Sequence, residues 1–400
     1  MGSMSLSRRF PVVAAVSLLV CVACDTPPGD VTEPGPEAAA AARDSAFVAA
    51  LPAQLAAETE AGRFSGAVLV ARDGRTLFEG AYGFADRERG IPNTPETQFR
   101  AGSMYKMPTA VATLQLVQAG TLRLDAPLGT YLPDYANADV ASRVTPHHLL
   151  THTGGTGDIF GPLFTAHRLE LRTTGDYIRL YGTRGLQFTP GTQHVYSNYG
   201  FILLGALIER LSGTRYDDHV AARVLVPAGM TATGTAPEDS LVPGRSVGYT
   251  RQLVPGSLVP TAPTLPYRGT SAGGGYSTVG DLARFAAAVR DRRLLDSTHT
   301  ALLYTGMVPV GTAFQDAYGF TDRVVGDRRW VGHGGGAAGM NGELAFEPNG
   351  GYVVAVVSNF DPPAATQVLN FVLGRLPTPR GTRQRIGPSW GSIPKQEGAR

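Results

Sequence analysis

A serine and a lysine three positions apart form the most conspicuous candidate for a catalytic pair in this sequence. They are Ser103 and Lys106, and the only other lysine in the 400 residues is Lys395. Arginine keeps its charge at any ordinary pH, whereas a buried lysine can lose its proton and then act as a base. On a helix this spacing places the hydroxyl and the amine one turn apart on the same face. Ser103 is therefore predicted to be a catalytic nucleophile, and Lys106 its base.

The same Ser-x-x-Lys spacing occurs again at Ser392 and Lys395, so the surroundings must distinguish the two pairs. After Lys106, apolar residues recur with a helical period as far as Gly120, which is typical of a buried helix with a C-cap. A proline interrupts the second pair, which lies in a basic segment at the end of the chain. We interpret that pair as coincidental and predict that residues 379–400 form a disordered tail.

Two further motifs can complete a site around the serine. Tyr196-Ser197-Asn198 precedes a predicted helix, so it is expected on a loop that presents a phenol beside an amide. A tyrosine can relay protons as a phenolate if cations lower its pKa, and an asparagine can hold a substrate carbonyl. His333-Gly334-Gly335-Gly336 ends a predicted strand, where the absence of side chains allows an extended substrate to approach the backbone.

The elements that must position these motifs follow from the hydrophobic pattern. Strand-like runs with turn formers beside them occupy residues 66–70, 76–78, 330–333, 342–346 and 351–358. Helical patterns lie between the two groups of strands, at residues 109–119, 199–211 and 281–289. The predicted fold class is α+β, with an antiparallel sheet built from both termini, flanking helices and a mostly helical subdomain.

Three motifs of this sequence, in their order along the chain, resemble those of the serine β-lactamase and penicillin-recognising hydrolase superfamily. They are Ser103-Met104-Tyr105-Lys106, Tyr196-Ser197-Asn198 and His333-Gly334-Gly335. The resemblance is closest to the class C-like branch, which includes DD-peptidases, D-aminopeptidases and family VIII esterases. It implies a β-lactamase/transpeptidase-like fold and an acyl-enzyme on Ser103. It also implies site roles for these residues: catalysis by Ser103, Lys106 and Tyr196; substrate binding by Asn198, His333, Gly334 and Gly335; and an oxyanion hole from the N–H groups of Ser103 and Gly336.

One departure from the class C pattern bears on the substrate. His333 stands where class C β-lactamases place a lysine that binds the substrate carboxylate. Because histidine is neutral over much of the range near pH 7, carboxylate recognition should be weaker or pH-dependent. We therefore expect an esterase or a D-amino-acid peptidase or carboxypeptidase. The alternatives are a class C-like β-lactamase and a penicillin-binding sensor or cell-wall binding protein without efficient turnover.

A different nucleophile is suggested by Gly269-Thr270-Ser271-Ala272-Gly273, which matches the Gly-x-Ser-x-Gly elbow of α/β-hydrolases. His333 follows it, with Asp281 or Asp316 between, in the order that such a triad requires. However, the elbow needs an apolar strand before the serine and a helix directly after it. The flanking residues supply neither, so we favour Ser103 over Ser271.

His148 and His152 have a spacing that could bind a metal on one helical face. No glutamate lies between them as in the zinc-protease pattern, and a structural role is the simpler interpretation. We therefore predict no metal and no other cofactor. The formal net charge of +2 arises from basic residues at the two ends of the chain, so no nucleic-acid partner is predicted either.

The first 45 residues have patterns that are typical of a targeting signal followed by a tether. Residues 1–23 are predicted to be an export signal, because two arginines precede a short apolar stretch. Residues 1–3 resemble a cloning remnant, since a second methionine, Met4, follows them. Val22-Ala23-Cys24 resembles a bacterial lipoprotein cleavage site, so Cys24 is a candidate for lipidation and membrane attachment. Residues 24–45 are expected to form a flexible Pro/Ala-rich tether, and residues 46–378 the hydrolase domain. The predicted location is the periplasm or the cell envelope.

Overall fold

The computed structural model describes residues 36–377 except residue 313. The predicted export signal, Cys24 and the predicted tail with Ser392 and Lys395 lie outside the described residues. Among the helices that are described, none is both long enough and apolar enough to cross a membrane.

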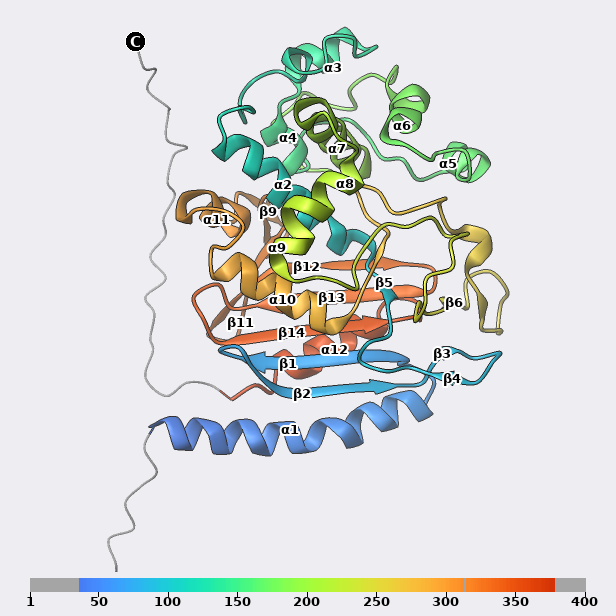
Figure 1. Ribbon diagram of the computed structural model, residues 1–400, viewed down its shortest axis with the longest axis vertical. Coiled ribbons are helices and arrows are strands. Elements are labelled where there is room, and N and C mark those ends of the chain that lie inside the picture. The colour runs from blue at the N-terminus through green and yellow to red at the C-terminus, as the bar shows by residue number, and fades with distance from the viewer. Residues whose placement is uncertain (1–35, 313, 378–400) are drawn as a thin grey trace, which may run out of the picture.

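One eight-stranded antiparallel sheet forms the centre of the described structure, in the order β2-β1-β14-β13-β12-β11-β10-β9. Its strands are β1 (Gly66–Arg72), β2 (Arg75–Tyr82), β9 (Val308–Val310), β10 (Phe314–Asp316), β11 (Thr321–Val325), β12 (Arg328–Ala337), β13 (Met340–Phe346) and β14 (Tyr352–Ser358). β1 pairs with β14 from Gly66 opposite Ser358 to Arg72 opposite Tyr352. Figure 1 accordingly shows the blue strands beside the red ones, which confirms the prediction of a sheet built from both ends of the chain.

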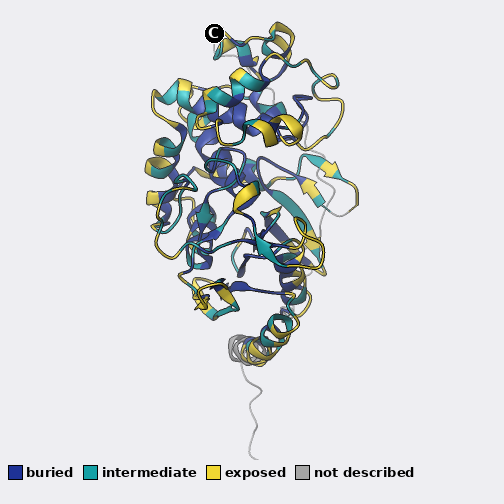
Figure 2. Ribbon diagram, turned by 90° about the vertical axis from the view of Figure 1, so that its right-hand side faces the viewer, coloured by how far each residue is buried: buried dark blue, intermediate teal, exposed yellow. Residues whose placement is uncertain are grey.

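Both faces of the sheet are covered, which explains the unbroken apolar sequence of β14. Val354 and Val356 face the core formed with α1 (Pro36–Glu60) and α12 (Ala364–Leu373). The alternate residues of β14 face the larger core, to which α10 (Val279–Arg290) and the other helices contribute. Because side chains alternate along a strand, a strand buried on both faces is expected to be apolar at successive positions. In Figure 2 the buried backbone runs through the middle of the molecule, between peripheral exposed segments.

The segment between the two groups of strands is mostly helical, as predicted, and its upper helices lie above the sheet in Figure 1. Its longer helices, α2 (Lys106–Gln118), α7 (Asn198–Ser212) and α10, match the three predicted helical patterns. The others are α3 (Ala138–Arg143), α4 (Pro146–Leu150), α5 (Pro162–His167), α6 (Thr174–Tyr181), α8 (Tyr216–Val220), α9 (Val226–Ala228) and α11 (Ser297–Tyr304). Three small pairs of strands complete the described structure: β3 (Phe84–Asp86) with β4 (Ile91–Pro92), β5 (Phe99–Arg100) with β8 (Tyr276–Ser277), and β6 (Tyr249–Thr250) with β7 (Val259–Pro260).

The predicted tether is wrong for residues 36–45, because α1 already begins at Pro36. Five consecutive alanines, at residues 38–42, explain the difference, since alanine has the highest helix propensity of all residues. The buried Asp44 also anchors this helix to the sheet. Its carboxylate accepts hydrogen bonds from Arg72 Nη1 at 2.8 Å and from the Tyr352 hydroxyl.

Candidate active site

Ser103 lies on a short 3₁₀ turn, η1 (Gly102–Tyr105), which leads directly into α2. Gly102 begins this turn with φ +54°, a left-handed conformation that favours glycine. A Cβ atom on Gly102 would also lie only 3.3 Å from the backbone nitrogen of Gly336. The backbone thus places Ser103 against β12 and Lys106 at the first residue of α2, so that Lys106 Nζ lies 3.4 Å from Ser103 Oγ.

Lys106 is completely buried, and its amine has three neighbouring oxygen atoms. Besides Ser103 Oγ these are Asn198 Oδ1, at 2.7 Å, and the carbonyl oxygen of Ala272. Burial lowers the pKa of Lys106 to about 7, although the negative charge of Asp158 opposes this shift. A neutral amine has two N–H donors and one lone pair. It can therefore donate to Asn198 and Ala272 and accept the proton of the Ser103 hydroxyl.

Tyr196 lies on the loop before α7, with its ring centroid 4.8 Å from Lys106 Nζ. Its side chain is 38% exposed, but its hydroxyl lies in the crowded site next to Ser103. Loss of solvation raises the pKa of Tyr196, and the hydrogen bond with Ser103 only partly opposes this shift. The phenolate considered from the sequence is therefore disfavoured, and the arrangement suits a neutral phenol beside a neutral amine.

Asn198 is the first residue of α7 and is buried, so it does not lie on the loop as expected. Its Oδ1 contacts Lys106, while its Nδ2 donates to Asp158 Oδ2 at 3.2 Å. The structure thus engages this side chain with protein groups, and its predicted role in holding a substrate carbonyl stays a prediction. Asp158 was missed in the sequence, where its position shortly after His152-Thr153-Gly154-Gly155 was the only available signal.

β12 supplies one edge of the site. β13 pairs with β12 as far as Ala337, whereas β11 pairs with it only as far as Gly332, so residues 333–336 have no strand partner on that side. Asn341 Nδ2 of β13 donates to the carbonyl oxygen of Gly335 at 3.0 Å. Since successive residues of a strand direct their polar groups to opposite edges, the Gly336 N–H faces the free edge. The oxyanion hole of Ser103 and Gly336 stays a prediction, with which this arrangement is compatible.

His333 lines a pocket of about 390 Å³ at this edge, together with Tyr196, Gly334 and Asp316. Burial, together with the smaller effect of the nearby Lys106, lowers the pKa of His333 to about 4. His333 is therefore neutral at pH 7 and supplies no positive charge in the position of the class C lysine. Arg323, a β11 residue, lines the same pocket.

Ser271, the alternative nucleophile, is buried and directed against Gly205 of α7. Its Oγ has no hydrogen-bond partner among the described residues. The two candidate acids of that triad bind other groups: Asp281 accepts from the Ala232 N–H, and Asp316 contacts His194 Nε2 at 2.6 Å. The structure therefore does not support a Ser271 triad.

The two histidines with metal-like spacing make separate structural hydrogen bonds. His148 Nδ1 accepts from the Thr145 N–H at 3.2 Å, and His152 Nδ1 accepts from the Ser197 N–H at 3.1 Å. Within residues 36–312 and 314–377, no cluster of three or more His, Cys, Asp or Glu residues is arranged to hold a metal ion.

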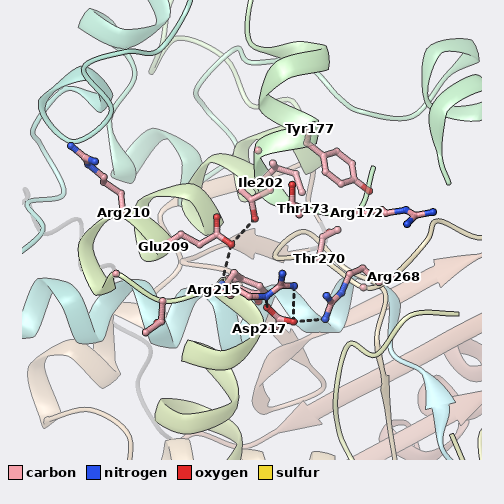
Figure 3. A pocket seen from close by; sticks show the side chains of 16 residues that line it. Arg172, Thr173, Tyr177, Ile202, Glu209, Arg210, Arg215, Asp217, Arg268 and Thr270 are labelled. Atoms are coloured by element: carbon pink, nitrogen blue, oxygen red, sulfur yellow. Dashed lines mark hydrogen bonds and ion pairs between the residues drawn. The ribbon is translucent and has the colours of Figure 1, made fainter. Parts of the chain in front are cut away.

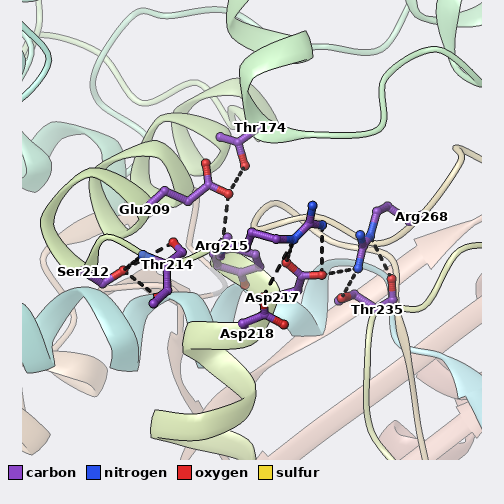
Figure 4. Close-up of polar contacts among 10 residues, drawn as sticks. Thr174, Glu209, Ser212, Thr214, Arg215, Asp217, Asp218, Thr235 and Arg268 are labelled. Carbon is purple, nitrogen blue, oxygen red and sulfur yellow. Dashed lines mark hydrogen bonds and ion pairs between the residues drawn. The ribbon is translucent and has the colours of Figure 1, made fainter.

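A larger cavity, of about 510 Å³, lies between α6, α7 and α8 and is lined by none of the predicted site residues (Figure 3). Its carboxylates are already satisfied by protein groups (Figure 4). Glu209 accepts from Thr174 Oγ1 at 3.1 Å and from the Tyr216 N–H at 3.0 Å. Asp217 binds both Arg215 and Arg268. We therefore place the chemistry in the smaller pocket, next to Ser103.

Comparisons with known proteins identify the family and the fold of this chain. The model of the Beta-lactamase family matches residues 46–376. Penicillin-binding protein 4 of Amycolatopsis lactamdurans is 30% identical over 304 residues, which cover 71% of this chain and 77% of that protein. Esterase EstB of Burkholderia gladioli is 38% identical over 198 residues, which cover 45% of this chain and 50% of that protein. The crystal structure of a penicillin binding protein from Bacillus halodurans, 31% identical, has a TM-score of 0.72 and covers 79% of this chain and 99% of that one.

Proposed function

Because this chain belongs to the Beta-lactamase family and is a serine hydrolase, we propose that it acts through an acyl-enzyme on Ser103, with Lys106 as the base. One observation carries the assignment of residues. The Lys106 amine is buried, two protein oxygens occupy its N–H donors, and the Ser103 hydroxyl is its third neighbour. A lysine whose pKa lies near 7 is matched to proton transfer at neutral pH.

In the proposed acylation, the Ser103 proton moves to Lys106 Nζ while Oγ forms a bond to the substrate carbonyl carbon. The N–H groups of Ser103 and Gly336 would stabilise the oxyanion. The bond to the leaving alcohol or amine then breaks, and the proton held by Lys106 returns to that group, directly or through the Tyr196 phenol. The product of this step is an ester of Ser103.

Deacylation uses the same groups in reverse. A water molecule would lose a proton to Lys106, assisted by Tyr196, as its oxygen bonds to the acyl carbon. The bond from that carbon to Ser103 Oγ breaks, and the proton returns to Oγ. Binding of the acyl and leaving groups would use His333, Gly334, Gly335 and Asn198, as predicted from the motifs.

For the substrate we propose an uncharged ester or a D-amino-acid peptide. The neutral state of His333 supports this choice, because His333 does not supply the positive charge that the lysine of class C enzymes offers to a substrate carboxylate. The similarity to an esterase from Burkholderia gladioli points in the same direction.

A second candidate activity, on β-lactams or peptides with a terminal carboxylate, is favoured by Arg323. Its side chain lines the substrate pocket and makes no hydrogen bond or ion pair within the described part of the chain. Glu343 lies near enough to act on its charge. Arg323 could therefore bind a carboxylate that His333 cannot.

The two candidates can be distinguished by comparing rates on p-nitrophenyl acetate, nitrocefin and a D-Ala-D-Ala peptide. We expect hydrolysis of the ester to be the fastest and Ser103→Ala to abolish every activity. If the carboxylate substrates are turned over well and Arg323→Gln removes only those activities, the second candidate is correct. If Ser103→Ala hydrolysed these substrates at the wild-type rate, the proposed nucleophile would be refuted.

A sensor without turnover is tested by intact mass spectrometry after exposure to a β-lactam. A transient adduct is expected for a hydrolase. An adduct on Ser103 that persists for hours, with no turnover of any ester or peptide, would show a penicillin-binding protein instead.

The targeting signals imply a periplasmic or cell-envelope lipoprotein, with Cys24 as the lipidated residue. Expression in a bacterial host followed by fractionation tests this proposal. The full chain should be found with membranes, and Cys24→Ala should be released to the soluble fraction. Equal distribution of the two proteins would rule out anchoring through Cys24.

A further inference from the structure

The carboxylate of Asp158, in the loop between α4 and α5, holds Asn198 at two points. Its Oδ1 accepts from the Asn198 backbone N–H, and its Oδ2 accepts from Asn198 Nδ2, both at 3.2 Å. The opposite side of the same amide, Asn198 Oδ1, lies 2.7 Å from Lys106 Nζ. A continuous chain of contacts therefore runs from Asp158 through Asn198 to the amine beside Ser103.

The chemistry of these groups permits only one orientation of the amide. An ionised carboxylate can only accept hydrogen bonds, whereas an asparagine amide has an accepting and a donating side. Asn198 must therefore present its NH₂ group to Asp158 and its oxygen to Lys106. If the amide were reversed, its NH₂ group would face Lys106, where only the amine lone pair could accept it. That lone pair would then be unavailable to Ser103.

We propose that Asp158 is a positioning residue of this active site: by orienting the Asn198 amide, it directs the lone pair of Lys106 toward Ser103. The inference rests on the proposed function, since it concerns the base of the proposed acylation. The loop that carries Asp158 is itself held in place. Arg184 Nη1 donates to the Asp158 carbonyl at 2.7 Å, and Ser197 Oγ donates to the Gly157 carbonyl at 2.5 Å.

The charge of Asp158 also acts on Lys106, and it raises the pKa of the amine against the effect of burial. The other titratable groups near Lys106 are the imidazoles of His152 and His333 and the Tyr196 phenol. Burial lowers the pKa of both imidazoles and raises the pKa of the phenol, so all three are neutral near pH 7. Removal of the Asp158 charge should therefore shift the pKa of Lys106 downward.

The test is the pH dependence of kcat/KM for p-nitrophenyl acetate in the wild type, Asp158→Asn and Asp158→Glu. Asp158→Asn should lower the plateau by about tenfold or more, because the amide of Asn198 loses its fixed orientation. Its acid limb should also move to lower pH. Asp158→Glu should recover part of the plateau and keep the acid limb near its wild-type position. The exposed Asp327, in the turn between β11 and β12, gives a matched control, since Asp327→Asn removes the same charge far from these contacts.

A purely structural role would lower the melting temperature of Asp158→Asn without shifting its acid limb. That result, or a profile that coincides with that of Asp327→Asn, would overturn the inference. The proposed function has a separate control, which is labelling of Ser103 by a fluorophosphonate. If Ser103 is labelled while Asp158→Asn has a wild-type profile, only the role of Asp158 is wrong; if Ser103 is not labelled, the proposed nucleophile fails as well.

Discussion

Lys106 combines a basic group with surroundings that disfavour its charge. The side chain is completely buried, and its neighbours are an amide oxygen, a backbone carbonyl and a hydroxyl. These groups are sufficient to orient a neutral amine, but they provide no full negative charge in contact with an ammonium ion. Desolvation of this kind lowers the pKa of a lysine, whereas an arginine in the same place would remain charged.

Replacement of Lys106 by arginine tests this role. Lys106→Arg keeps a long basic side chain, but its guanidinium stays charged and cannot accept the Ser103 proton. We expect kcat/KM for p-nitrophenyl acetate to fall by at least about 10²-fold. Circular dichroism should show that the variant is folded, and near-normal turnover by a folded variant would remove Lys106 from the mechanism.

The pH dependence of the wild-type enzyme follows from the same group. Because the pKa of Lys106 is about 7, the amine is neutral and able to accept a proton above this pH, and it is charged below it. Measured kcat/KM should therefore rise through pH 7 to a plateau, and at pH 6 it should be about tenfold lower. A rate that is constant from pH 5 to pH 9 would contradict a lysine base.

The sequence was sufficient to identify the groups that have a local pattern. Ser103 and Lys106 share a helical turn, and the structure brings Tyr196 and His333 to the same pocket region as predicted. The groups that hold Lys106 could not be identified in this way. Ala272 acts through a backbone carbonyl, which any residue possesses, and Asp158 acts through Asn198 across 40 positions of sequence.

Among the secondary-structure elements, the close approach of β12 to η1 determines the geometry of the site. A Cβ atom on Gly335 would lie 2.4 Å from the Ala101 carbonyl oxygen and 2.9 Å from the Ser103 nitrogen. Both neighbours are backbone atoms and cannot turn aside as a side chain could. Glycine at this position therefore allows the strand to lie against the turn that carries Ser103.

Gly335→Ala should push β12 and η1 apart. We expect a loss of stability of roughly 1–3 kcal/mol from overpacking. Activity should fall by about 10²-fold, because the two proposed oxyanion donors no longer converge. Gly185→Ala is a matched control, since a Cβ atom there meets no other atom within 4 Å. If Gly335→Ala retained full activity and stability, the close packing would not be required.

The elements themselves were predicted most reliably where the apolar pattern is continuous. The sheet strands at both ends and the helices α2, α7 and α10 belong to this class. The start of α1 was missed because the prolines and glycines just before it are typical of a tether, while alanine occurs in tethers and in helices alike. Its decisive contacts, from Asp44 to Arg72 and Tyr352, depend on residues far away in the sequence.

The architecture of the entire described chain joins its two ends and places the site between sheet and helices. β1 and β14 pair along their full length, and α1 and α12 cover the face of the sheet opposite to Ser103. Asp44 connects these distant parts, because its partner Tyr352 is 308 positions away. The groups around Ser103 likewise come from α2, α7, β12 and the loop that carries Ala272, so the site requires the complete fold.

Asp44→Ala should weaken this connection without touching the site. The substitution leaves the buried Tyr352 hydroxyl and Arg72 without their shared acceptor, which should lower the free energy of unfolding by about 2 kcal/mol. Urea unfolding measures this change, and kcat/KM at 25 °C should remain at the wild-type value. Glu60→Ala, at the exposed end of α1, should leave both quantities unchanged. Equal stability of the two variants would show that Asp44 does not anchor α1.

The central claim is that the Ser103 hydroxyl, beside the neutral Lys106 amine, is the nucleophile. Peptide mass spectrometry after reaction with a fluorophosphonate at pH 8 tests this claim most directly. The structure predicts a single modified serine, Ser103, and greatly reduced labelling at pH 5, where Lys106 is protonated. Modification of Ser271 with Ser103 left unreacted, or labelling of the Ser103→Ala protein at the wild-type rate, would contradict it.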